Sequence, residues 1–128
     1  MIILISESQK DVLKENIIGQ KVMVYYNLHK HCYSLKSLEG KTRGKVIGYR
    51  DEVDLVNVEF KVSEKGRQRV LKEQKKNVHA GVVGELINPV AVCKELKEMY
   101  YNPYITETFV EKSSNKPVKK AEYALLKD

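Results

Sequence analysis

The sequence contains few cysteines, no long hydrophobic run and no specific catalytic motif. Cys32 and Cys93 are isolated, without a C-x-x-C pair, so neither a disulfide framework nor a structural zinc site is indicated. The opening MIILIS is too short for a transmembrane helix or for the apolar part of a secretion signal, and no basic segment precedes it. We therefore expect a cytoplasmic protein with reduced thiols and no cofactor.

Internal repeats, low-complexity tracts and linkers are also absent from the 128 residues. A chain of this length can bury a core within one domain, so we expect a single domain over residues 1–128. The triplet G-K-T at 40–42 lacks the upstream glycine of a phosphate-binding loop, and no helical pattern follows it. We interpret residues 39–44 as a hairpin loop.

The hydrophobic pattern predicts an α+β fold, with a mostly antiparallel sheet of five to seven strands and two or three short helices. In Val56–Val62, apolar and polar residues alternate, as in a half-buried antiparallel strand. Further strands are predicted over 21–28, 32–38, 45–49, 78–87, 106–110 and 118–126. These strands belong to a core that we place at residues 21–128.

Three segments carry helix signals. Residues 1–20 are expected to form a helical extension, with a helix over 7–17 that follows a capping box at 6–9 and ends before Gly19, while 1–5 form a short strand or a frayed start. Ser63 is the natural N-cap of a second, basic helix. Asn88-Pro89 predicts a third helix over 90–100.

Positive charge is concentrated around the second helix. Between positions 61 and 76 there are seven Lys or Arg and two Glu, a net charge of +5 in a chain whose total is +6. Such clustering favours an anionic partner, with nucleic acid first and the acidic surface of a protein second, although a charge run can also be a solvated helix face. A membrane partner is not indicated, because no basic helix has a broad apolar face. The cationic candidates for binding are Lys30, Lys65, Arg67, Arg69, Lys72, Lys75 and Lys76.

The helical period separates Arg67 from Arg69. Val70 and Leu71 define the inward side of the helix, and Arg67 and Gln74 project between them. Arg69, Lys72 and Lys76 project the opposite way, into solvent. We expect Arg67 to need a carboxylate, carbonyl or phosphate partner at the border of the core.

Histidines provide the only candidates for acid–base chemistry. If His29 or His31 met His79 across adjacent strands, the pair would suit phosphodiester cleavage, with a lysine or arginine stabilising the developing charge. The alternative is that His79 is a half-buried strand residue with a satisfied ring. No cysteine or carboxylate has a diagnostic spacing to His29 and His31, so a metal site is not indicated. The sequence leaves open whether the protein is an enzyme.

Eight tyrosines are many for this length, and exposed tyrosines beside cations can stack on bases. Strand tyrosines usually pack in the core. The run Tyr100-Tyr101-Asn102-Pro103-Tyr104 falls in an expected loop, so we take Tyr101 and Tyr104 as candidates for a contact surface.

Six segments, in order, carry a family resemblance: NLHK at 27–30, LEG at 38–40, VSE at 62–64, GRQRVL at 66–71, KNVHAG at 76–81 and YNPY at 101–104. Over roughly residues 22–126 the chain resembles a family of small bacteriophage and prophage proteins without a settled activity. The resemblance implies a phage accessory role in the host cytoplasm, either handling nucleic acid or blocking a host defence complex.

We therefore expect a phage-type protein that binds RNA or single-stranded DNA through the basic helix, with nuclease activity left open. Two alternatives remain at this stage. One is an inhibitor that binds a host nucleic-acid-dependent defence complex, and the other is a structural accessory protein of the phage particle.

Overall fold

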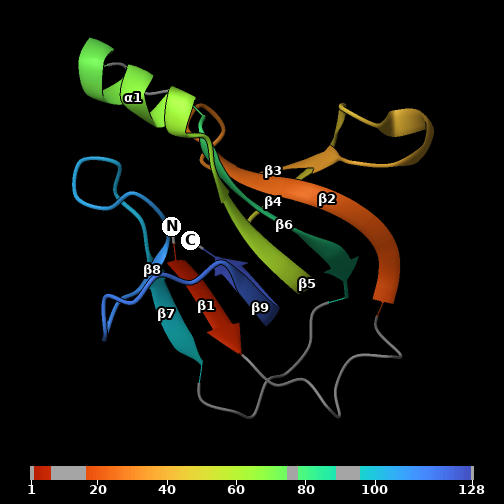
Figure 1. The fold of residues 1–128 in the computed structure, drawn as a ribbon. Helices are drawn as coiled ribbons and strands as arrows, with labels where there is room; N and C mark the ends of the chain where they lie inside the picture. Colours follow the sequence, from red (N-terminus) through yellow and green to blue (C-terminus); the bar gives the residue numbers. More distant parts are fainter. Residues whose placement is uncertain (1, 7–16, 75–77, 89–95, 128) are drawn as a thin grey trace.

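The computed structural model describes residues 2–6, 17–74, 78–88 and 96–127. Nine strands form one sheet in the order β4-β3-β2-β6-β5-β9-β1-β7-β8, and neighbouring strands are antiparallel (Figure 1). The strands are β1 (Ile2–Ser6), β2 (Ile17–Asn27), β3 (Cys32–Ser37), β4 (Val46–Arg50), β5 (Val53–Val62), β6 (Ala80–Ile87), β7 (Lys97–Tyr100), β8 (Val110–Glu111) and β9 (Lys120–Lys127).

One α-helix, α1 (Glu64–Glu73), and one 3₁₀ turn, η1 (Gly40–Thr42), complete the secondary structure of the described residues. The predicted α+β class with two or three helices is therefore wrong, because this part of the chain is mostly β. The prediction of five to seven strands was also too low.

The predicted helix over 90–100 is wrong at its described end. Residues 97–100 form β7, in which Met99 lies opposite Ile3 of β1 and is buried. The short apolar run that suggested a helical face instead fills a strand position, because pairing with β1 overrides the local propensity. Residues 90–95 lie outside the described part of the chain.

The N-terminal region contributes strands to the sheet. Ile2–Ser6 forms β1, which pairs with β9 on one side and β7 on the other. The predicted helix over 7–17 falls outside the described residues, apart from Ile17, which begins β2. The central strands and the helix start at Ser63 are confirmed within a few residues.

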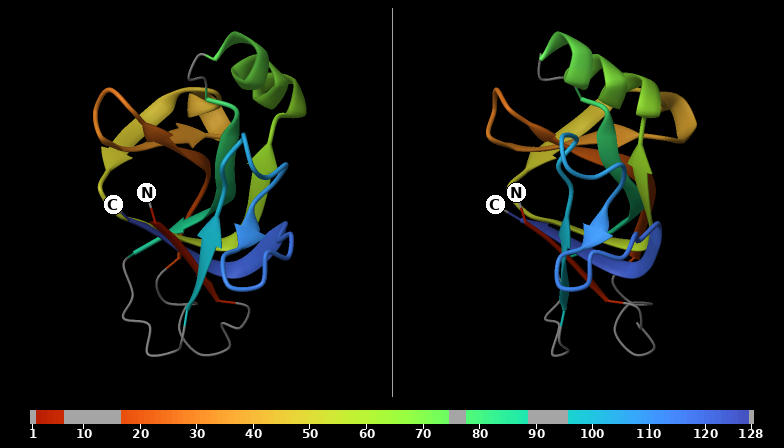
Figure 2. Two further views of the ribbon diagram at one scale, coloured as in Figure 1. Left: turned by 90° about the vertical axis from the view of Figure 1, so that its left-hand side faces the viewer. Right: turned by 60° about the vertical axis from the view of Figure 1, so that its left-hand side comes forward.

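The sheet is strongly curved, so strands that are distant in the sheet order face one another (Figures 1 and 2). The hydroxyl of Tyr33 in β3 donates to the carbonyl oxygen of Lys127 at the end of β9 at 3.0 Å, although β2, β6 and β5 separate these strands in the sheet. The hydrophobic core lies on the concave side and includes Val24, Leu55 and Ala124, all fully buried. Curvature thus closes the core, and among the described residues no layer of helices covers it.

A buried polar pair lies on the other face of the sheet from this core, where Val56 and Ile87 form a small separate cluster. The hydroxyl of Tyr123 in β9 donates to Oδ2 of Asp54 in β5 at 2.5 Å, and Asp54 is buried. Burial is the main factor that raises the pKa of Tyr123, and the hydrogen bond to a carboxylate raises it further. The phenol of Tyr123 therefore stays protonated, and its hydrogen bond links the neighbouring strands β5 and β9.

Candidate functional site

Helix α1 stands at one end of the sheet, after β5 and before β6 (Figure 1). The Ser63 hydroxyl accepts a hydrogen bond from the Gly66 amide at 3.2 Å, and Glu64 lies in the first turn, where a negative charge complements the helix dipole. The helix ends at Gln74, which is in the left-handed region with φ of 53°. Val70 is buried, which fixes the side of the helix that faces the sheet.

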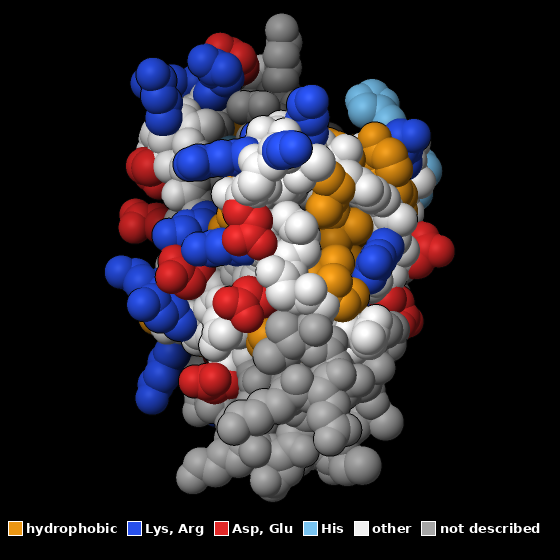
Figure 3. Space-filling model, turned by 90° about the vertical axis from the view of Figure 1, so that its right-hand side faces the viewer, with side chains coloured by type: hydrophobic (Ala, Val, Ile, Leu, Met, Phe, Trp, Pro, Cys, Tyr) orange, Lys and Arg blue, Asp and Glu red, His pale blue; other side chains and the backbone are white. Residues whose placement is uncertain are grey.

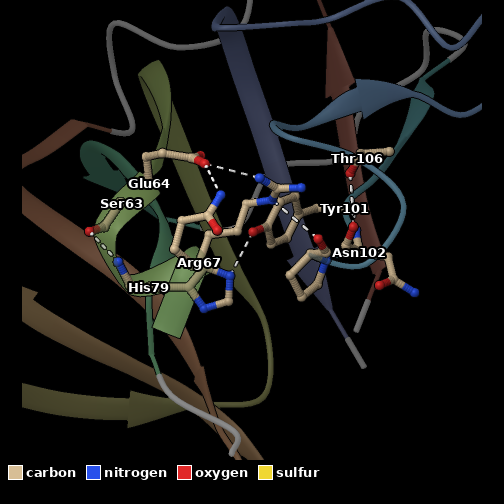
Figure 4. A network of polar contacts seen from close by, with 10 residues as sticks. Ser63, Glu64, Arg67, His79, Tyr101, Asn102 and Thr106 are labelled. Carbon is tan, nitrogen blue, oxygen red and sulfur yellow. Dashed lines mark hydrogen bonds and ion pairs between the residues drawn. The ribbon is translucent and has the colours of Figure 1, made fainter. Parts of the chain in front are cut away.

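Arg67 lies on the inward side of α1, as predicted, and its side chain is only 12% exposed. Its Nε donates to the Pro103 carbonyl oxygen at 3.1 Å, and one terminal nitrogen contacts Glu64 Oε1 at 3.0 Å (Figure 4). The Gln68 amide also donates to this Glu64 oxygen at 2.8 Å. The Gln68 hydrogen bond, together with the Arg67 charge, holds the pKa of Glu64 below its usual range. Arg67 thereby attaches the loop after β7 to the helix.

His79 makes the second link between these elements. Its Nε2 lies 2.6 Å from the Tyr101 hydroxyl, and its backbone carbonyl accepts from the Ser63 amide at 2.7 Å (Figure 4). The His79 backbone is close to α1, because a Cβ atom added to Gly66 would lie 2.6 Å from the His79 Cβ and 3.6 Å from its Cα. These contacts match the alternative of a half-buried strand histidine with a satisfied ring.

Tyr101 packs into the core from the loop side. Its ring stacks on Phe109 with centroids 5.0 Å apart, and Phe109 in turn lies 5.1 Å from the ring of Phe60. Burial raises the pKa of Tyr101 to about 12. Tyr101, which we expected on a contact surface, is therefore a packing residue that holds the loop in place.

The tip of the same loop points outward. The Asn102 side-chain oxygen accepts from the Tyr104 amide at 3.0 Å, and the Asn102 carbonyl accepts from the amides of Ile105 and Thr106. This tight turn leaves Tyr104 61% exposed and Ile105 70% exposed. Because Tyr104 directly follows Pro103, the Arg67 hydrogen bond attaches the loop that bears this exposed aromatic ring to the inward side of α1.

The opposite side of α1 is cationic. Lys65, Arg69 and Lys72 are all exposed, and their spacing of four and three residues places them on one face. Lys75 and Lys76 lie outside the described residues.

His29, Lys30 and His31 lie on the turn between β2 and β3. The Asn27 side chain accepts from the amides of His29 and Lys30, each at 3.0 Å, and the Lys30 ammonium lies 4.4 Å from the ring centre of Tyr49. All three turn residues are exposed. In the described part of the chain, no hydrogen bond, ion pair or ring contact joins either turn histidine to His79.

The sequence reasoning found Arg67, His79, Tyr101 and Tyr104 but not what connects them. Glu64, Phe109 and the Pro103 carbonyl were missed as partners, and Ile105 was missed as part of the exposed tip. Asn102 was the available signal, because an asparagine before proline commonly organises a turn through its side chain.

Comparison with known proteins identifies the family of this chain. Residues 16–128 match the model of the Mycobacterium phage L5 gene 82 protein family. The chain belongs to that family. It is 38% identical over 114 residues to the gene 82 protein of Mycobacterium phage L5, an alignment that covers 84% of this chain and 90% of that protein. No solved structure matches. The predicted resemblance to a phage family of unsettled activity is confirmed.

Two further properties of this gene 82 family member bear on its site. No helix in the described residues is long and apolar enough to cross a membrane. Within the same residues, no three His, Cys, Asp or Glu side chains gather closely enough to hold a metal ion.

Proposed function

We propose that this phage protein binds RNA or single-stranded DNA through the exposed face of α1 and the adjoining loop tip. The observation that carries the proposal is that the exposed face of α1 is cationic, while a largely buried arginine on its inward side holds an adjoining loop that bears an exposed tyrosine. Lys65, Arg69 and Lys72 supply charges for successive phosphates, and Tyr104 supplies a ring on which an unpaired base can stack.

The exposed cations of α1 are free to meet a polyanion, because the contacts that maintain the fold are made by residues on the inward side of the helix. Arg67 is bound to Pro103 and Glu64, so the exposed cations are separate from the residues that maintain the fold. Binding therefore requires no rearrangement of the buried contacts, and removal of the exposed cations should leave the fold intact.

The positions of the histidines favour binding without cleavage. A general acid and a general base must lie on opposite sides of one substrate group. In this structure the His79 ring is hydrogen-bonded to Tyr101, whereas His29 and His31 lie on the exposed β2–β3 turn. We expect labelled single-stranded RNA to stay intact on incubation with the protein, with or without a chelator. Cleavage that is lost in both His79→Ala and His29→Ala would overturn this part of the proposal.

The binding test measures fluorescence anisotropy of a short single-stranded oligonucleotide over a range of salt concentrations. Replacement of Lys65, Arg69 and Lys72 by Ala should reduce the slope of log affinity against log salt by about 2, since each phosphate contact on a single strand contributes about 0.7. A matched variant removes three other exposed cations, Lys116, Lys119 and Lys120, and should change the slope much less.

Tyr104→Ala tests the aromatic contact. It should weaken binding to a single strand by about 1–3 kcal/mol while affecting a duplex little, because only unpaired bases offer a free face for stacking. Absence of oligonucleotide binding at low salt, or equal effects of the two triple variants, would overturn the proposal. An acidic protein surface, such as that of a host defence complex, would then be the partner class to test.

A further inference from the structure

The two edges of the sheet differ in how they are covered. At one edge, β8 is only two residues long, and its outer side is bridged to Pro117, with the Glu111 amide donating to the Lys116 carbonyl at 2.9 Å. A short edge strand followed by proline is a common protection against pairing with another chain. At the other edge, β4 is five residues long and, in the described part of the chain, pairs only with β3.

Strand β4 is also unusually apolar for an exposed edge. Val46, Ile47 and Tyr49 are 40%, 42% and 49% exposed, and no proline interrupts the strand. Figure 3 views the side of the molecule on which the β3–β4 hairpin lies in Figure 1, and shows a band of hydrophobic side chains bordered by cations. An exposed apolar strand with unpaired backbone groups is a template for strand addition.

The local charge distinguishes between classes of partner. From position 45 to 52 the sequence is KVIGYRDE, in which two cations and two carboxylates give no net charge within a chain of +6. This strand therefore offers little to a polyanion, in contrast to α1. A second copy of the same chain would meet no net repulsion here.

We propose that β4 pairs with β4 of a second copy, antiparallel about a two-fold axis at Gly48. In this register Lys45 lies opposite Asp51 of the partner copy, and Ile47 lies opposite Tyr49. Opposite charges and aromatic–β-branched pairs are both favourable across antiparallel strands. A two-fold axis repeats each pair, so one strand supplies both halves of a self-complementary interface.

A β-bulge limits the length of this pairing. The register between β3 and β4 shifts between Leu35 and Lys36, which leaves Ile47 without a partner in β3. Bulges increase the local twist of a strand, so the paired segment is short and centred on residues 46–50. We therefore expect a dimer that dissociates in the micromolar range and not an obligate one.

The test is sedimentation velocity of the full chain over a range of concentrations. The wild-type protein should show a concentration-dependent dimer. Ile47→Lys places two like charges close to the axis and should raise the dissociation constant by about tenfold or more. Ile18→Lys is the matched control, because Ile18 is 47% exposed but lies on β2, and this variant should dimerise normally.

A charge exchange tests the register. Lys45→Asp alone and Asp51→Lys alone each put like charges opposite one another and should weaken the dimer, whereas the double variant should restore it. Circular dichroism melting of each variant checks that these exposed substitutions leave the fold intact. The proposal would be overturned if the protein stayed monomeric at every concentration, or if Ile47→Lys left the dimer unchanged. It would also be overturned if the double charge exchange failed to restore a dimer that the single exchanges weaken.

Discussion

Arg67 and Arg69 show how far two identical side chains on one helix can differ. The Arg67 side chain is 12% exposed and bonded to a backbone carbonyl, whereas Arg69 is exposed on the opposite side of α1. A guanidinium removed from water needs such partners, because an unpaired buried polar group is costly. Arg67 is therefore expected to act on folding, and Arg69 on binding.

At this residue scale we predict that Arg67→Ala lowers the free energy of unfolding by about 1–3 kcal/mol, because it releases the loop and leaves the Pro103 carbonyl without its donor. Arg69→Ala should change it by less than about 0.5 kcal/mol. Urea denaturation followed by circular dichroism measures both. Equal losses of stability in the two variants would show that Arg67 does not support the fold.

At the scale of the element, α1 is positioned by its close approach to β6. Glycine in a helix normally costs stability relative to alanine, since the backbone is freer in the unfolded state. Gly66 lies where a Cβ atom would meet the His79 Cβ at 2.6 Å, so this position needs a residue without a side chain. The helix can lie this close to His79 only because position 66 is glycine.

We therefore predict that Gly66→Ala destabilises the protein, against the usual helical trend, by about 1–3 kcal/mol, the typical cost of forcing an extra carbon into a packed site. Gly48→Ala is the control, because its added Cβ would meet Leu35 at an ordinary 3.6 Å. Thermal and urea unfolding of dilute protein provide the comparison. A stabilised Gly66→Ala variant would mean that the helix can shift away from β6.

At the scale of the whole molecule, the curved sheet depends on contacts between strands that are not neighbours. Tyr33 reaches the end of β9, while Tyr101 joins the loop after β7 to His79 at the start of β6. Both contacts use tyrosine, which supplies a large apolar ring and a hydrogen-bonding hydroxyl. Since Tyr101 is half-buried as a neutral phenol, its contact with His79 should depend on pH.

Burial raises the pKa of Tyr101 from 10.0 to about 12, so the folded state favours the protonated phenol. Its contribution to stability is complete below the unfolded pKa of 10 and is lost as pH rises from 10 toward about 12. Urea denaturation across this range should show falling stability, less steeply in Tyr101→Phe than in the wild type. Tyr104→Phe alters an exposed ring and should keep the wild-type slope; identical slopes in all three proteins would contradict the prediction.

Local pattern was enough for much of the secondary structure. Alternation in Val56–Val62 and the serine cap at position 63 predicted β5 and α1 because strand and helix periods are set by neighbours along the chain. The side of α1 on which Arg67 lies followed from the same period.

Family membership and the concentration of charge were likewise readable from the sequence, since both depend on residue identity alone. The sequence determined which residues are cationic, apolar or able to cap a helix. Only the tertiary structure decided that 97–100 is a strand beside β1. It alone also showed that the His79 ring is hydrogen-bonded to Tyr101 and not to a turn histidine, and that Arg67 holds the loop bearing Tyr104. The physical reason is that these contacts join residues far apart in the chain, and their partners are set by the curvature of the whole sheet, which no local period encodes.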